Sequence, residues 1–191
     1  MSPTSMPSHA PETPMLIAWT ALTLALLGLP LGCSSGDAAA DLADPLDACA
    51  LLTSADVTEV LDIEDPEVSA MKRGDDTAWL SGCNYHGEAN GNLRSAGLMV
   101  SPHGVAAGPQ KAFAAEQTSL VETLGDDAAL EPVARLGDRA GWQDFDTGIG
   151  QLIIFDGPYR LTVTANAAEG VDQRSTAEQL AERVLARLPA R

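Results

Sequence analysis

QLIIFDGPYRLTVTAN, residues 151–166, contains the clearest strand pattern in the chain. Its first part is a nearly continuous apolar run through Phe155, which is typical of a central, buried strand. Asp156-Gly157 is a hairpin signal. From Tyr159 to Asn166 apolar residues alternate with polar ones, which indicates a half-buried strand. The stretch therefore predicts a β-hairpin within an antiparallel sheet.

Three more strands are predicted upstream of this hairpin. They span residues 79–85, 93–101 and 142–145. Alternation in the first of them places Trp79, Cys83 and Tyr85 on one face. Residues 71–76 are polar and residues 126–131 are acidic, so both are predicted to be loops. The expected sheet has about five strands.

Three helices are predicted from their end signals and apolar stripes. They run over Ser54–Leu61, Pro109–Leu124 and Ser175–Leu188. Thr53 and Asp56 form a capping box before the first helix, and Ser175 and Glu178 form one at the third. Gly125 suits the position just after the second. We expect an α+β domain whose antiparallel sheet of about five strands has helices packed on one face. The other face would be open to solvent and to a ligand.

An uncharged apolar run precedes Cys33 near the N-terminus. Residues 15–31 have about the length of a long signal-peptide core, and Gly32 supplies a small residue before the cysteine. The pattern resembles the bacterial lipobox, in which the cysteine is acylated and becomes the first mature residue. Two features depart from that pattern: Pro30 stands where Leu is usual, and no Lys or Arg precedes Lys72.

This resemblance gives the expected domain organisation. Residues 1–32 would be a lipoprotein-type signal peptide, residues 33–46 a flexible acidic tether, and residues 47–191 a single α+β domain. The protein would be extracytoplasmic and held on the cell membrane by lipid at Cys33. An ordinary secreted protein and an uncleaved N-terminal anchor are the alternatives.

The chain is strongly acidic, with 27 Asp and Glu against 11 Lys and Arg and a net charge of −16. Such a chain repels phosphates, so nucleic acid is excluded as an expected partner. An anionic bilayer would also repel it, which suits a domain held away from the membrane by a tether. The carboxylates form no calcium-loop pattern, and neither a metal nor a cofactor is predicted.

Acylation of Cys33 would leave two cysteines, Cys49 and Cys83. In an oxidising compartment such a pair most simply forms a disulfide. Closing a loop of this size would stabilise the domain by about 3–4 kcal/mol in the chain-entropy description. Two separate buried thiols are the alternative. Neither cysteine belongs to a C-x-x-C pattern, which disfavours a metal site.

Candidate catalytic groups are few. The mature chain would contain two histidines, His86 and His103, and their expected positions at a strand end and in a Pro-Gly turn favour exposed side chains. Loop aspartates could pair with them as acid and base. These are Asp75, Asp76, Asp126, Asp127, Asp144 and Asp146. Trp79, Tyr85 and Trp142 could face a ligand, although core packing is the other role open to these aromatic residues.

Three short segments carry a family resemblance: CALLTSAD at residues 49–56, GCNY at 82–85 and LGDRAGW at 136–142. Together they resemble small actinobacterial lipoproteins of unknown function, which begin with a C-x-L-L-T-x-x-[DE] helix start. The resemblance implies an exported α+β lipoprotein with one disulfide, and it transfers no catalytic residue. A more distant similarity is to the extracellular sensor domains of some actinobacterial serine/threonine kinases.

Two functions are compatible with these observations. The first is a non-enzymatic binding or interaction module on the cell envelope, whose ligand would be a small apolar molecule, an envelope polymer or a protein. The alternative is an envelope-directed hydrolase that uses His86 or His103 with loop aspartates. The sequence favours the first over an enzyme, because no nucleophile, base and orienting group occur in a recognisable pattern.

Overall fold

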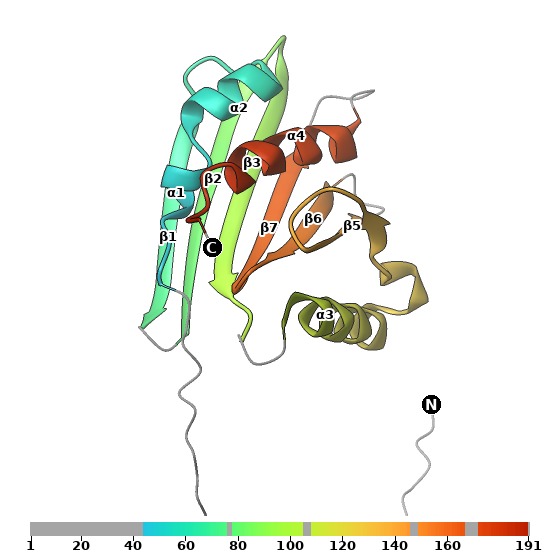
Figure 1. The fold of residues 1–191 in the computed structure, drawn as a ribbon. Helices are drawn as coiled ribbons and strands as arrows, with labels where there is room; N and C mark the ends of the chain where they lie inside the picture. The colour runs from blue at the N-terminus through green and yellow to red at the C-terminus, as the bar shows by residue number, and fades with distance from the viewer. Residues whose placement is uncertain (1–43, 76–77, 105–107, 146–148, 167–171, 191) are drawn as a thin grey trace, which may run out of the picture. The chain divides into compact units, whose positions relative to one another are not determined.

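The computed structural model describes residues 44–75, 78–104, 108–145, 149–166 and 172–190. These residues form a seven-stranded antiparallel sheet in the order β1-β2-β3-β7-β6-β5-β4, with four α-helices (Figure 1). The strands are β1 Glu67–Asp75, β2 Ala78–Ala89, β3 Asn92–Pro102, β4 Glu131–Val133, β5 Arg139–Phe145, β6 Ile149–Asp156 and β7 Tyr159–Asn166. The helices are α1 Ala48–Leu51, α2 Ser54–Leu61, α3 Gly108–Leu124 and α4 Gln173–Leu185, with a short 3₁₀ turn, η2, at Asp126–Ala128.

The predicted hairpin lies in the middle of the sheet. β6 pairs with β7 in a register that places Ile154 opposite Leu161, and β7 pairs in turn with β3. Gly157 has a φ of 54°, a conformation that glycine adopts without strain, at the turn between the two strands. The α+β class and the antiparallel sheet are therefore confirmed.

The expected number of strands was too low, because two edge strands were not predicted. β1 occupies most of the segment expected to be a polar loop, and it pairs with β2 over its whole length. Its side chains are exposed except for half-buried Met71, so the strand carries no burial periodicity that a sequence pattern could reveal. β4 is short and contains Pro132, which is tolerated at the edge of a sheet.

The expectation that all helices cover one face was also wrong. α1, α2 and α4 pack on one face over the main core, which includes Ile154. Phe113 of α3 packs against Phe155, with ring centroids 6.1 Å apart. Successive residues of a strand point to opposite faces, so α3 covers the other face of the sheet at β5 and β6.

Two helix starts illustrate how capping sets the boundaries. The predicted capping box at α2 is confirmed: Thr53 accepts from the Asp56 N–H, and Asp56 accepts from the Thr53 N–H. At α4, however, Asp172 is the N-cap and accepts from the Ser175 N–H at 3.2 Å. The helix consequently begins two residues earlier than predicted and ends at Leu185.

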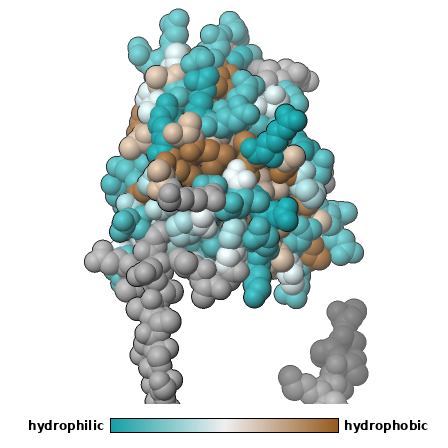
Figure 2. All heavy atoms as spheres, in the orientation of Figure 1, coloured by the Kyte–Doolittle hydropathy of each residue, from teal (hydrophilic) through white to brown (hydrophobic). Residues whose placement is uncertain are grey.

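Cys49 and Cys83 form a disulfide that joins α1 to β2. The main core around it is continuous, and partly buried Leu46, Leu185 and Leu188 extend it. Figure 2 shows hydrophobic residues in the middle of the face that carries α1 and α4, with hydrophilic residues around them.

Cys33, the expected signal peptide and most of the expected tether lie outside the described residues. Within the described ranges, no helix has the length and hydrophobicity to cross a membrane.

Candidate binding site

The three aromatic residues proposed to face a ligand all lie in the main core. The exposed fractions of Trp79, Tyr85 and Trp142 are 7%, 1% and 6%. The Tyr85 hydroxyl donates to the Leu52 carbonyl, and burial raises the pKa of this phenol. A Cβ added at Gly150 would lie 2.0 Å from the Trp142 ring, so this indole packs directly on strand backbone. Core packing therefore accounts for Tyr85 and Trp142.

Trp79 also lines two concavities at one end of the sheet. One has a volume of about 460 Å³ and is closed by the end of β3, and the other has a volume of about 320 Å³ and is closed by the residues before α1. Both are lined by Arg73, Gly74, Trp79 and Leu80. Because they share these four residues, the two concavities are treated together and are called the Trp79 site below.

The backbone of β1 and β2 shapes this site. Gly74 has a φ of 92°, and a Cβ there would lie only 1.8 Å from the Ala78 carbonyl oxygen. The Asp75 carboxylate accepts from the Ala78 N–H at 3.1 Å, which holds the two strand ends together. The Trp79 ring in turn lies 6.3 Å from the Tyr159 ring, measured between centroids. A glycine at position 74 therefore allows the close approach that positions Trp79 and Leu80.

Charges at the Trp79 site connect it to the start of the domain. Lys72 of β1 forms an ion pair with Asp47 at 3.0 Å, and Asp47 also caps α1 by accepting from the Cys49 N–H. The hydrogen bond from Lys72 is the main cause that lowers the pKa of Asp47. Arg73 is exposed and, within the described part of the chain, forms no ion pair. The lining of the site therefore combines apolar side chains with charges of both signs, since Asp47 and Asp75 lie beside Lys72 and Arg73.

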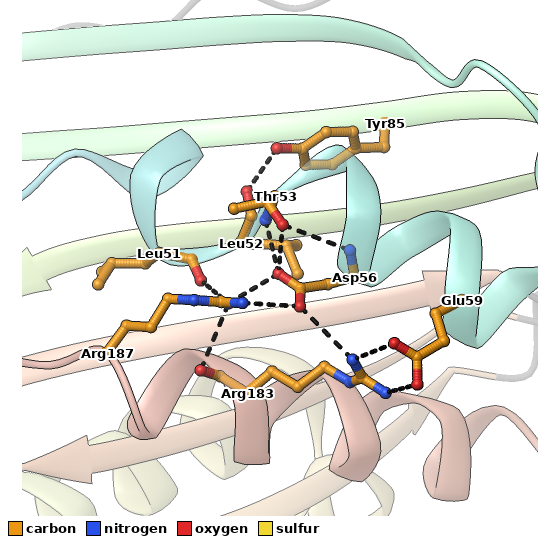
Figure 3. A network of polar contacts seen from close by, with 8 residues as sticks. All are labelled: Leu51, Leu52, Thr53, Asp56, Glu59, Tyr85, Arg183 and Arg187. Atoms are coloured by element: carbon orange, nitrogen blue, oxygen red, sulfur yellow. Dashed lines mark hydrogen bonds and ion pairs between the residues drawn. The ribbon is translucent and has the colours of Figure 1, made fainter.

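A second polar feature is the buried cluster around Asp56, whose side chain is only 4% exposed (Figure 3). Arg187 donates to both Asp56 oxygens, at 2.7 and 2.9 Å, and the Thr53 hydroxyl and N–H donate to the same carboxylate. Burial opposes ionisation of Asp56, but these hydrogen bonds outweigh it and hold the pKa of the carboxyl well below its ordinary range.

The Asp56 cluster connects α2 to α4. Arg183 contacts Asp56 at 3.6 Å and pairs more closely with Glu59 at 2.6 Å. Local sequence patterns could not bring these groups together, since 131 residues separate Asp56 from Arg187. The carboxylate is saturated by these donors, so the cluster stabilises the fold and is not a candidate site.

The two histidines lie apart from each other. Nε2 of His103 is 2.7 Å from the Gly157 carbonyl oxygen, and its ring packs edge-on to Phe155. His86 is exposed on β2. In the ranges that the structure describes, neither ring contacts a carboxylate or hydroxyl, and no group of three or more His, Cys, Asp or Glu could hold a metal ion. Asp76 and Asp146 lie outside those ranges.

No family model and no curated protein matches the chain. Among solved structures, the chain is similar to the extracellular domain of PknH from Mycobacterium tuberculosis, at 14% identity and a TM-score of 0.45. The match covers 73% of this chain and 95% of that one. A likeness at this level assigns neither a function nor a ligand.

Proposed function

We propose that the protein is an extracytoplasmic, lipid-anchored and non-enzymatic binding module, of the kind found among small actinobacterial lipoproteins. The observation that carries the binding role is the Trp79 site, where two concavities of about 460 and 320 Å³ share one wall. Their sizes lie within or close to the range of small-molecule sites. The ligand is a small apolar molecule or an apolar segment of an envelope polymer or protein, bound in one of these concavities.

The compartment is supported by two features of the chain. A disulfide between Cys49 and Cys83 suits an oxidising environment, and residues 15–33 carry the lipobox-like pattern. Lipidation of Cys33, with palmitate as the expected acyl group, would leave a tether of about ten residues before the described domain begins. Pro45, Leu46 and Asp47 line the Trp79 site, so the site lies where the chain enters the domain.

Ligand screening on the exported protein tests the binding role. We expect compounds that bind to shift the amide NMR signals of residues 72–81. Leu80→Ala removes apolar wall from both concavities and should weaken binding about tenfold, on the scale of about 1–3 kcal/mol for apolar contacts in a pocket.

Leu93→Ala is the matched control, because Leu93 is 75% exposed near the opposite end of β3 and lines neither concavity. Binding that shifts no signal in residues 72–81, or that is unaffected by Leu80→Ala, would remove the Trp79 site from the proposal.

Mass spectrometry of the mature N-terminus tests the anchor. We expect the chain to begin at Cys33 with an acyl modification, and Cys33→Ser to move the protein out of the membrane fraction. A mature chain that begins elsewhere would eliminate the lipid anchor while leaving the binding role to its own test.

A further inference from the structure

A separate concavity of about 480 Å³ lies beside the connection between β4 and β5. Its apolar wall is formed by Phe113 of α3, Val133 of β4 and Leu136 and Ala140 around the connection. None of these residues lines the Trp79 site. The volume lies within the range in which proteins bind small molecules.

Two arginines, Arg135 and Arg139, complete the lining of this concavity. In the described residues neither guanidinium group forms an ion pair or a hydrogen bond, whereas Arg160, Arg174 and Arg183 each pair with a carboxylate. Acidic residues outnumber basic ones by 27 to 11, so a basic side chain in this protein should readily find a partner. Both side chains are exposed, so their guanidinium groups are free to meet an anion that enters the concavity.

Two carboxylates near the concavity, those of Glu131 and Asp138, interact with other groups. Glu131 of β4 pairs with Arg174 at 2.7 Å. Asp138 also lines the concavity, and its carboxylate accepts from the Gly157 N–H at 2.9 Å. These contacts hold Glu131 toward Arg174 and Asp138 toward the β6–β7 turn, so the lining of the concavity carries two guanidinium groups and one hydrogen-bonded carboxylate.

The backbone of Arg135 gives an independent indication. Its φ is 72°, in the left-handed region that disfavours a residue with a long side chain. Gly137, two residues later, has a φ of 59°, so glycine is used in this same connection where such a conformation is needed. An arginine in a strained conformation and without a partner in the described fold is a candidate for a role in binding.

We propose that this concavity, the Arg135–Arg139 site, binds an amphipathic anion. A carboxylate or phosphate group is held by the two guanidinium groups, which match the geometry of such oxyanions. The apolar body of the ligand lies against the partly exposed side chains of Phe113 and Val133. This proposal stands on different residues from the Trp79 site and does not depend on it.

Titration of the exported chain with matched small probes tests this proposal. The probes are 4-phenylbutyrate, phenyl phosphate and the neutral 4-phenylbutan-1-ol, at an ionic strength of about 0.15 M, where remote acidic groups are largely screened. We expect at least one anion to shift the amide NMR signals of residues 133–140 and to bind at least tenfold more tightly than the alcohol. The preferred anion then identifies the head group. Equal affinity for the alcohol, or no shift in residues 133–140 with either anion, would overturn the proposal.

Two substitutions separate binding from folding. Arg139→Gln should weaken anion binding at least tenfold. Lys111→Gln is the control, because Lys111 is an exposed residue of α3; the substitution removes the same charge and should leave anion binding unchanged. Arg135→Gly should also abolish tight binding, yet it should not lower the melting temperature, because glycine relieves the strained backbone. Retained anion binding in both arginine variants would contradict the assignment of these residues.

Discussion

Helices α3 and α4 are both predicted from apolar residues along one side, yet they pack against the sheet in different ways. Five residues of α4 are buried, and the helix packs against α2 and the central strands. α3 has seventeen residues, all described, and none is buried. Its apolar contacts are with a small cluster of Leu130, Ile153 and Phe155. The main core thus lies under α4, whereas α3 covers part of the opposite face.

Polar contacts follow the same division. α4 is joined to α2 by the buried Asp56 cluster, in which Arg187 and Arg183 participate. α3 is joined to β7 by one pair between Glu116 and Arg160, with distances of 2.6 and 3.1 Å. The comparison teaches that stability is concentrated on the α4 face. The Arg135–Arg139 site lies beside α3, where fewer contacts constrain the side chains that would meet a ligand.

Truncation of one leucine in each helix should give the largest difference between the two helices in the loss of unfolding free energy. Leu180 of α4 is fully buried, so Leu180→Ala should lower the free energy of unfolding by about 3–4 kcal/mol through lost burial and the cavity that remains. Leu120 of α3 is half-buried, and Leu120→Ala should cost about 1 kcal/mol. Urea unfolding monitored by circular dichroism measures both. Equal losses would show that α3 is as firmly integrated as α4.

Removal of one charge from the polar contact of each helix should give a smaller difference in the loss of unfolding free energy. Asp56→Asn breaks the cluster and weakens the α2 cap, and should cost about 2 kcal/mol, because the arginines it leaves behind remain partly exposed to water. Glu116→Gln is the matched change at α3 and should cost at most about 1 kcal/mol. The same unfolding measurements compare them, and a greater loss for Glu116→Gln would reverse the comparison.

Acid should weaken the α4 contact. The pKa of Asp56 is lower in the folded than in the unfolded chain. Its contribution to folding stability is therefore fully present above the unfolded pKa of about 3.9 and is lost as the pH falls toward the folded pKa. Unfolding free energies measured between pH 6 and pH 2 should therefore decline less steeply for Asp56→Asn than for the natural chain. Parallel profiles would mean that Asp56 does not contribute this pH dependence.

The smallest expected effect is at the connection beside α3. Arg135→Gly removes the left-handed strain, which costs about 1–2 kcal/mol for residues other than glycine, but adds freedom to the unfolded chain. The net change should be a stabilisation of about 0.5 kcal/mol. Thermal unfolding by calorimetry detects it as a raised Tm, and a clearly lowered Tm would assign Arg135 a structural role.

Local sequence patterns predicted the elements whose determinants are close together in the chain. The capping box at Thr53 and the hairpin at Asp156-Gly157 are examples, since each depends on residues within a few positions. β1 could not be predicted in this way, because an edge strand exposed on both faces has no apolar alternation. The pattern in α3 identified a helix but contained no information about which face of the sheet it would cover.

The candidate sites were less predictable than the fold. Trp79 was selected as an aromatic residue, but its position at two concavities depends on the pairing of β1 with β2 and on Gly74. Arg135 and Arg139 are near neighbours in the sequence, and neither was selected as a site residue. Their distinguishing feature is that both line one concavity, which depends on how the connection between β4 and β5 folds against α3.

Amide hydrogen exchange, measured with and without 4-phenylbutyrate, distinguishes the two faces: α4 belongs to the stable core, and α3 lies on a weaker face that contains the anion site. We predict that α4 amides exchange only through global unfolding, whereas α3 amides exchange through local opening at a lower free energy. The anion should slow exchange in α3 and residues 133–140 by more than any effect of global stabilisation seen in α4. Equal protection of the two helices, together with no selective slowing by the anion, would contradict the account.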